Sequence, residues 1–434
     1  MNPHLKLLQQ YESRNVTHLA SDGSWPIVWE RAKGVHVWDA DGKKYLDLTG
    51  AFAVAATGHA NPRVTKAAQK QMEQLPHAMG DVHPHALKGQ LAQALSKITY
   101  ERWARTEFRN TQKHPHPHEM PPRHAKTIFC NSGFEAVEAA LKTAHLATGK
   151  PGVIAFDGAY HGLGYGTLST THRPMFRAPF QRQLGKFGHF ISFPETKRAL
   201  KQTRASLQML FKKHPVGAVL VEPIQGRAGI RVPPPELLRE LSVLCRKHDA
   251  LFICDEIYTG LGRTGKWFAC EHSSFFPDLI CLGKALTNGF PLSACVGRAT
   301  VMDRAWPASD GEAIHTSTFL GHPVGCAMAL AQIRELKERK LVTQVNRLGK
   351  KFGKMCKRHP IPGARYVGCG LMAGLAFNES EGPRVHSAVK EMLRRGYILL
   401  PAGEHGNVIA FTPPFTITEK QLESALVTLR KVMS

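Results

Sequence analysis

Short apolar runs alternate with helical patterns along the chain after residue 125, and this alternation limits the possible folds more than any other feature. It predicts strand-helix units that pack into a mostly parallel sheet flanked by helices. Turn residues that suit helix starts precede the first two helical patterns. The expected strands are residues 127–130, 153–156, 218–221, 251–254, 279–282 and 294–296, and the expected helices are 135–147, 235–247 and 322–339.

Two residues with reactive side chains follow expected strands. Asp255 ends the apolar run 251–254, and Lys284 follows the apolar run 278–283. In open sheets of this type, ligands bind beyond the carboxyl ends of the strands, where both side chains are expected. A buried lysine can form a Schiff base with the aldehyde of pyridoxal phosphate, and a buried carboxylate can keep the pyridine nitrogen protonated. Either residue alone is uninformative, because strands often end in acids and most lysines are solvated.

The residues around this pair resemble the signatures of one enzyme family. Residues 255–265, DEIYTGLGRTG, resemble the aspartate signature of the class III pyridoxal-phosphate aminotransferases, and residues 283–286, GKAL, resemble the lysine signature. The similarity extends from residues 34–42, which resemble the family's amino-terminal hairpin, to Thr412-Pro413-Pro414 near the carboxyl end. Several motifs that match in the same order leave little room for chance.

This resemblance implies the α/β architecture of fold type I. A large domain would hold a mostly parallel sheet of the seven-stranded type flanked by helices, and a smaller α+β domain would form from both ends of the chain. The implied boundaries are 1–60 for the amino-terminal part of the small domain, 61–320 for the large cofactor-binding domain and 321–434 for the carboxyl-terminal part. The sequence itself contains no obvious linker.

The bulk composition agrees with a large soluble enzyme. A length of 434 residues exceeds one ordinary core, and 43% hydrophobic residues can fill it. No apolar stretch approaches the ~20 residues of a membrane helix, and residues 1–6 do not resemble a signal peptide, so a cytoplasmic location is expected. Nine scattered cysteines without CxxC spacing are typical of reduced core residues, not of a disulfide framework or a zinc site.

The charge is the one unusual bulk property. The 57 Lys+Arg residues against 34 Asp+Glu give a formal net charge of +23, which would attract polyanions such as nucleic acid. The basic residues are spread through helical stretches such as 334–340 and 350–354, however, with no basic arm and no interleaved aromatic residues. We therefore expect a generally basic, solvated surface, and we do not expect nucleic acid as a main partner.

A segment rich in proline and histidine, residues 111–122, interrupts the alternation. Its prolines cannot continue a helix or a central strand, so a surface loop is expected. Its three histidines at alternate positions could bind a metal, but an extended, proline-locked backbone does not close a ligand set around an ion. No metal site is expected there.

A phosphate-binding turn is expected at residues 131–134, where Asn-Ser-Gly-Phe follows a strand and opens a helix. The first amides of a helix and its aligned dipole bind anions, so the Ser132 hydroxyl and the amides of Gly133 and Phe134 would face the phosphate. Alone, a Ser-Gly pair at a helix start is more often only an N-cap. Family members usually carry a small or hydroxylated residue at the position of Phe134, so one side-chain hydrogen bond would be missing here.

The family resemblance also assigns residues to the two faces of the cofactor ring. Tyr160-His161-Gly162 resembles an aromatic-His-Gly signature of the cofactor site, in which the aromatic residue stacks on the pyridine. Ile257 lies two residues past Asp255, on the same side of an extended strand, and would cover the other face. The alternative for Tyr160 is an ordinary core tyrosine.

Two more segments carry residues that the resemblance assigns to the cofactor. The sequence EPIQG contains Gln225, which is similar to the residue near the cofactor's phenolic oxygen, and Glu222, which we expect to be structural. Thr318 resembles the threonine that reaches the phosphate in the neighbouring subunit, so a homodimer is implied. A helix-capping threonine is the alternative. His322 stands where the family usually has asparagine.

The residues expected to bind the substrate depart from the family pattern. Many members that use glutamate or ornithine carry arginines where this chain has Leu163 and Ala410, and a glutamate where it has Arg227. Compared with those members, the positive charge lies on the opposite side of the pocket. Loss of the arginine at 410 would leave a glutamate at 227 buried and unpaired, which is costly, so the two changes belong together. We expect Arg227 to bind a substrate carboxylate, with a solvated loop arginine as the alternative. Phe52 and Trp25 could line the apolar space or only pack in a core.

These observations together predict a class III aminotransferase that uses pyridoxal phosphate. It would move an amino group from an ω-amino acid or amine to a keto acid, pyruvate or 2-oxoglutarate. Lys284 would move the proton between the substrate and cofactor carbons while Asp255 keeps the ring nitrogen protonated. An aminomutase or an amino-acid racemase needs the same two residues and is an alternative. A non-catalytic protein with a basic binding surface is a remote one.

Overall fold

Seven strands form the central sheet, in the order β4-β10-β9-β8-β7-β5-β6. All neighbours are parallel except β10, which runs antiparallel to both β4 and β9. In this computed structural model, which describes residues 2–110 and 124–434, the strands are β4 (Ala125–Cys130), β5 (Gly152–Phe156), β6 (Gly188–Ile191), β7 (Val216–Val221), β8 (Leu251–Asp255), β9 (Leu279–Leu282) and β10 (Ser293–Arg298). The predicted mostly parallel sheet is confirmed.

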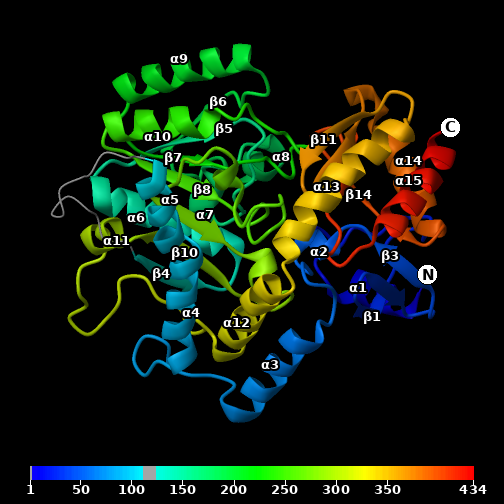
Figure 1. The fold of residues 1–434 in the computed structure, drawn as a ribbon, viewed down its shortest axis with the longest axis horizontal. Coiled ribbons are helices and arrows are strands. Elements are labelled where there is room, and N and C mark those ends of the chain that lie inside the picture. The colour runs from blue at the N-terminus through cyan, green and yellow to red at the C-terminus, as the bar shows by residue number, and fades with distance from the viewer. Residues whose placement is uncertain (1, 111–123) are drawn as a thin grey trace.

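Helices cover both faces of this sheet (Figure 1). Strand β7 is buried along its whole length, as expected for a strand enclosed on both faces. Its residues alternate between the faces: Val219 and Val221 belong to the hydrophobic cluster of α9 and α10, whereas Ala218 and Leu220 belong to that of α6. These helices are α6 (Gly133–Thr148), α9 (Lys197–Lys213) and α10 (Leu237–Lys247).

Each predicted strand and helix is present, with ends that differ from the expected ones by at most two residues. Strand β6 was not predicted from the sequence. Its four residues, Gly-His-Phe-Ile, lie at the edge of the sheet and only the last is buried. An edge strand of this kind lacks the continuous apolar run that marks a central parallel strand.

Two four-stranded sheets lie outside the central sheet. The first has the order β1-β2-β3-β13, in which β13 (Tyr397–Ile398) pairs in parallel with β3 (Lys44–Asp47) and so joins the two ends of the chain. The second has the order β11-β12-β15-β14 and is antiparallel throughout. Their other strands are β1 (Trp29–Lys33), β2 (His36–Asp39), β11 (Arg365–Cys369), β12 (Met372–Ala376), β14 (Leu400–Ala402) and β15 (Val408–Phe411). The boundaries 1–60, 61–320 and 321–434 stay a prediction.

The remaining helices surround these sheets. Helix α12 (Pro323–Glu338) packs along α3 (Pro62–Gln74), and α13 (Leu341–Arg358) runs from the large sheet towards the small ones (Figure 1). The others are α1 (Pro3–Tyr11), α2 (Gly50–Ala53), α4 (Ala86–Ile98), α5 (Tyr100–Asn110), α7 (Tyr165–Leu168), α8 (Pro174–Arg177), α11 (Ala299–Ala305), α14 (Gly382–Arg394) and α15 (Glu419–Met433).

The cysteines behave as the sequence predicts: all nine are free, and eight of them are buried. Among the helices of residues 2–110 and 124–434, none combines the length and apolar character needed to cross a bilayer. The segment 111–122, predicted to be a surface loop without a metal site, lies outside the described residues.

Candidate active site

Asp255 and Lys284 stand at the carboxyl ends of two neighbouring parallel strands, β8 and β9. The register pairs Asp255 with Cys281, three residues before Lys284. Lys284 opens the 3-10 helix η4 (Lys284–Leu286) with a φ of 39°, in the left-handed region that is costly for any residue except glycine. Backbone strain of this kind is concentrated at functional sites. The sheet thus brings the two predicted residues to one edge.

The Lys284 amine occupies a partly buried position among charged groups. Its Nζ lies 4.5 Å from the centroid of the Tyr258 ring. Burial lowers the pKa of Lys284, and the nearby Arg227 lowers it further. The charges of Asp255 and Glu222 raise this pKa without cancelling the shift. A lowered pKa increases the fraction of neutral amine, which is the form that attacks a carbonyl and accepts a proton.

Asp255 is only 4% exposed, and its carboxylate is held from two sides. Nδ1 of His161 lies 2.8 Å from Oδ2, and the backbone amide of Ile257 donates to Oδ1 at 3.1 Å. His161 is itself buried, and its backbone amide donates to the hydroxyl of Thr171 at 2.9 Å. A carboxylate in a dry site needs such donors to stay ionised. His161 therefore contacts Asp255, and its predicted role in cofactor binding stays a prediction.

The predicted phosphate turn joins β4 to the start of α6. Oε2 of Glu135 accepts hydrogen bonds from the amides of Asn131, at 2.6 Å, and Ser132, at 3.1 Å. The amides of Gly133 and Phe134, which open the helix, have no preceding turn to bond to. The buried Ser132 hydroxyl has no hydrogen-bond partner among the described residues. The turn therefore offers free donors at the positive end of a helix dipole.

Phe134 fits in this turn because the facing segment contains glycines. A Cβ on Gly162 would lie 2.2 Å from Cβ of Phe134, and one on Gly164 would lie 2.7 Å from its ring. Gly162 also has a φ of 117°, which other residues rarely adopt. The aromatic residue at an otherwise small position is thus accommodated by the missing side chains opposite.

Tyr160 and Ile257 lie on different elements around the two strand ends. The amide of Tyr160 donates to Oε1 of Glu222 at 3.0 Å, which ties the Tyr160 loop to the end of β7. Ile257 fills the space between the phosphate turn and β9: its side chain lies 3.0 Å from a Cβ placed on Gly133 and 3.4 Å from one placed on Gly283. The roles of both as walls of a cofactor ring stay predictions.

Glu222 and Gln225 are buried and bonded within the protein. Besides the Tyr160 amide, Glu222 accepts a hydrogen bond from the amide of Gly226 at 3.0 Å, and burial raises its pKa. The side-chain amide of Gln225 donates to the Asp157 carbonyl at 2.8 Å and accepts from Nη1 of Arg231 at 3.1 Å. Both ends of the Gln225 amide are therefore engaged, and its predicted place near the cofactor's phenolic oxygen stays a prediction.

Arg227 follows the segment of Glu222 and Gln225 and lies at the solvent side of the site. Its guanidinium carbon is 4.5 Å from the centroid of the Tyr160 ring and 5.5 Å from that of Phe176, and its side chain is exposed. A second arginine, Arg173, donates from Nη2 to the Arg227 carbonyl at 2.6 Å. Burial lowers the pKa of Arg173, and the charge of Arg227 lowers it further. Two cations thus border one rim of the site.

Comparison of the sequence with known proteins identifies the family of this chain. The family model for class-III aminotransferases matches residues 19–433. The chain belongs to the class-III aminotransferases. It is 34% identical to the acetylornithine aminotransferase of Methanopyrus kandleri, with 95% of each chain covered, and 33% identical to the 5-aminovalerate aminotransferase DavT of Pseudomonas aeruginosa, with 93% of this chain and 92% of the relative covered.

Solved structures of aminotransferases share the fold over nearly the whole chain. The omega transaminase from Pseudomonas jessenii in complex with PMP has a TM-score of 0.84 at 25% identity, with 98% of this chain and 96% of the other covered. The ornithine aminotransferase from Toxoplasma gondii has a TM-score of 0.80 at 28% identity, with 99% and 93% covered. The fold predicted from the sequence is confirmed.

Class-III aminotransferases use pyridoxal phosphate, and the site of this aminotransferase fits that cofactor. Lys284 supplies an amine with a lowered pKa, and Asp255 supplies a buried carboxylate. Ser132 and the start of α6 supply a hydroxyl and amides without partners among the described residues. An amine, a carboxylate and an anion-binding turn match the aldehyde, the ring nitrogen and the phosphate of the cofactor.

Two residues of the aminotransferase site were missed by sequence reasoning. Tyr258 contacts Lys284, and its position directly after Ile257 in the aspartate signature was the available signal. Arg173 borders the site through Arg227, but a single arginine in the polar segment after β5 carries no local signal.

Three more residues were predicted to contact the substrate or a partner's cofactor. Phe52 is 64% exposed in the turn of α2, which lies beside η4, and both Phe52 and Ala51 have positive φ angles of 60° and 49°. Trp25 is partly buried against the hydrophobic clusters around β2 and β3. Thr318 is exposed in the loop before α12. Their contacts with substrate or with a partner's cofactor stay predictions.

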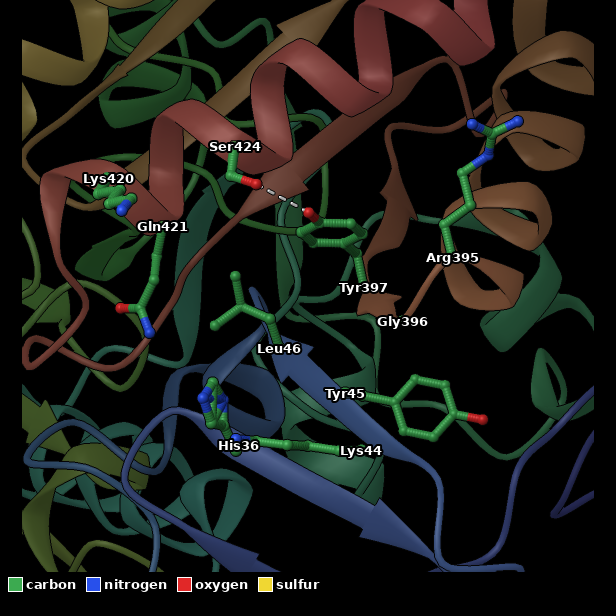
Figure 2. Close-up of a pocket in the computed structure, with 10 residues that line it drawn as sticks. All are labelled: His36, Lys44, Tyr45, Leu46, Arg395, Gly396, Tyr397, Lys420, Gln421 and Ser424. Carbon is green, nitrogen blue, oxygen red and sulfur yellow. Dashed lines mark hydrogen bonds between the residues drawn. The ribbon is translucent and has the colours of Figure 1, made fainter.

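A separate hollow of about 390 Å³ lies between β2, β3, β13 and the start of α15. His36, Lys44 and Lys420 line it, and Figure 2 shows the Arg395 side chain directed away from it. Arg395 is instead paired with Glu391 at 2.8 Å. The lining contains no carboxylate and no residue of the Lys284 site. This hollow therefore lacks the pair of an amine and a carboxylate that aminotransferase chemistry needs.

Proposed function

We propose that this aminotransferase moves amino groups from ω-amino acids or amines to a keto acid, pyruvate or 2-oxoglutarate. The observation that carries the proposal is the position of Lys284 and Asp255 at the ends of adjacent strands. The positions where many relatives carry arginines hold Leu163 and Ala410 in this chain. Leu163 is 48% exposed and Ala410 is buried, so neither position offers a charge for an α-carboxylate. The named activities of the relatives, on acetylornithine and 5-aminovalerate, both involve ω-amino groups.

The residues divide the chemical work. Pyridoxal phosphate, when bound, supplies an aldehyde for the amino group and a ring that takes up electrons. With the cofactor bound, Lys284 would accept the proton from the substrate carbon and donate it again, which its lowered pKa favours. Asp255 keeps a proton on the ring nitrogen. Ser132 and the first amides of α6 hold the phosphate in place.

Arg227 is proposed to bind the carboxylate of the keto acid. It is exposed, and its guanidinium lies over Tyr160 and Phe176, which keeps its N–H edge free for a bidentate contact. Arg173 adds a second positive charge on the same rim and steadies the Arg227 backbone through its hydrogen bond. The positive rim selects acidic acceptors, while the apolar side accepts donors that lack an α-carboxylate.

A homodimer is part of the proposal. Two surface segments near Thr318 contact each other: Thr316 donates to Asp81 at 2.6 Å, and the rings of Phe319 and His77 lie 5.3 Å apart. These segments expose apolar side chains that monomeric proteins seldom cluster on the surface. They are Met72, Leu75, Met79, Val82, Ile314 and Phe319. The cytoplasmic location rests on nine free cysteines, which suit a reducing compartment.

The test is a panel of ω-amino acids and amines with pyruvate and 2-oxoglutarate. Conversion of the bound cofactor between its aldehyde and amine forms is followed by absorption, with the Lys284→Ala variant as the control without a catalytic amine. We expect conversion by ω-amino donors and reversal by a keto acid. Product formed without any keto acid would instead indicate an aminomutase or a racemase, and full turnover by Lys284→Ala would refute the assigned role.

A further inference from the structure

The Tyr258 side chain contacts the reactive amine of Lys284, although it lies outside the hydrogen bonds of Asp255. Nζ of Lys284 is 4.5 Å from the centroid of the Tyr258 ring, within the ~6 Å over which a cation is attracted to an aromatic face. The attraction is strongest where water is excluded, and both residues are at least partly buried. A contact of this kind depends on whether the amine carries its proton.

The ring is fixed from behind by the backbone and by a small apolar cluster. A Cβ on Gly226 would lie 2.1 Å from Cδ1 and 2.4 Å from Cε1 of Tyr258, so the ring lies directly on a backbone that has no side chain. Tyr258 also packs against a small hydrophobic cluster. The members of that cluster are Ile224, Ile230, Met372 and Ala410.

The hydroxyl of Tyr258 is directed to a structural partner. Burial raises its pKa, and a hydrogen bond with Thr412 partly opposes that shift. Thr412 is buried and donates from its own hydroxyl to the Thr49 carbonyl at 2.8 Å. A phenol with a raised pKa that is bonded to a structural threonine is a poor proton donor or acceptor in turnover. The ring face, not the hydroxyl, is the part that meets the amine.

We propose that Tyr258 is a positioning residue of this aminotransferase, whose ring face holds the ammonium form of Lys284 between the two proton transfers. The inference rests on the proposed role of Lys284. With the cofactor bound, Nζ of Lys284 would accept a proton from the substrate carbon and would then give up the same proton. Between these steps Lys284 is a cation without a covalent bond to hold it. The ring stabilises that cation and limits where Nζ can move.

The contact adds to the balance that sets the basicity of Lys284. Burial destabilises the ammonium, and the charges of Asp255 and Glu222 stabilise it. Asp255 is also the proposed partner of the ring nitrogen, so a bound cofactor would share its charge. The Tyr258 ring stabilises only the protonated form of the amine.

The experiment measures the proton affinity of Lys284 without turnover. The enzyme is loaded with pyridoxamine phosphate, so that Lys284 is free, and is labelled with trace acetic anhydride across a range of pH. Mass spectrometry compares acetylation of Lys284 with that of the exposed Lys354. Tyr258→Phe keeps the ring and should match the wild type. Tyr258→Leu removes the ring and should shift the midpoint down by about half to one and a half pH units.

Gly226→Ala is a second way to move the Tyr258 ring away from Lys284, because the added Cβ displaces the ring while leaving Tyr258 in the chain. It should shift the midpoint in the same direction, and it takes the place of Tyr258→Leu should that variant not fold. A midpoint that stays at the wild-type value without the ring in place overturns the proposal. Failure of the proposed function would look different: the wild-type labelling profile would persist while no amino donor converts the cofactor.

Discussion

Nδ1 of His161 lies 2.8 Å from Oδ2 of Asp255, and both residues are almost completely buried, at 2% and 4% exposure. A carboxylate in such a place is stable only if donors replace the lost water. The imidazole supplies one of these donors and also fixes the direction of the carboxylate. The cofactor's ring nitrogen would meet a carboxyl group whose orientation is set before binding.

Replacing His161 should weaken the cofactor's binding. The His161→Leu variant removes a hydrogen bond to a charged group, worth roughly 1.5–3 kcal/mol, so the affinity for pyridoxal phosphate should fall about ten- to a hundredfold. Absorption titration of the cofactor-free enzyme measures it. The control is His172→Leu, since His172 pairs with the half-exposed Asp157 at 3.2 Å. Equal affinities in the His161 variant and the wild type would contradict the link through Asp255.

The charge of Asp255 should matter more for the reaction than for the fold. Asp255→Asn keeps the shape and can still bond to His161, but it cannot hold a proton on the ring nitrogen by its charge. We expect kcat to fall about a hundred- to a thousandfold, as for the removal of one preorganised electrostatic partner. The melting temperature should change little. The control Asp310→Asn, at an exposed position, should leave kcat and the melting temperature unchanged. If Asp255→Asn keeps a kcat near that of the wild type, the assigned role of Asp255 is ruled out.

The strand ends could be predicted from the sequence, whereas contacts across the site could not. Asp255 and Lys284 end apolar runs, and the carboxyl ends of parallel strands share one edge, so local pattern was enough to bring them together. The ring of Tyr258 reaches Lys284 because Gly226, on a separate loop, leaves room behind it. Such packing depends on residues that are distant in the sequence. Neither the hydrophobic periodicity nor the spacing of motifs predicts it.

The hydrogen bonds of Gln225 illustrate the same limit. Its place near the cofactor's phenolic oxygen stays a prediction, and its bonds to Asp157 and Arg231 could not be read from the EPIQG sequence. Hydrogen-bond partners are chosen by three-dimensional proximity, which a motif in one segment does not report. Strand β6 was missed for a different reason, because an edge strand does not need the apolar run of a central one.

A buried glutamate behind the site should make the fold sensitive to pH. Burial raises the pKa of Glu256 from 4.5 to about 7, although Thr259 and the amides of Ala269 and Cys270 donate to it. The folded chain binds this proton more tightly than the unfolded chain, so protonation stabilises the fold. Stability from this group is therefore present at low pH and is lost as pH rises from about 4.5 through 7.

Urea unfolding of the wild type and of Glu256→Gln at about pH 5 and about pH 8 measures this effect. The glutamine cannot ionise, so the stability difference between the two proteins should move in favour of the variant by roughly 2 to 3 kcal/mol over this range. A difference that is the same at both pH values would mean that Glu256 titrates near its ordinary pKa in the folded chain.

Arg227 should determine the affinity for the acceptor and not the rate of the chemical step. Its guanidinium stands over Tyr160 and Phe176 at the rim of the site. Arg227→Ala should raise the KM for pyruvate and 2-oxoglutarate about tenfold or more while kcat changes little, because a contact made equally in the ground and transition states affects binding alone.

Arg182→Ala, which removes an exposed arginine elsewhere, controls for the lost positive charge. Arg227→Lys should recover only part of the affinity, since an ammonium cannot form the bidentate contact. An unchanged KM for every keto acid in Arg227→Ala would show that the acceptor's carboxylate is bound elsewhere, with Arg173 as the nearest remaining cation on that rim.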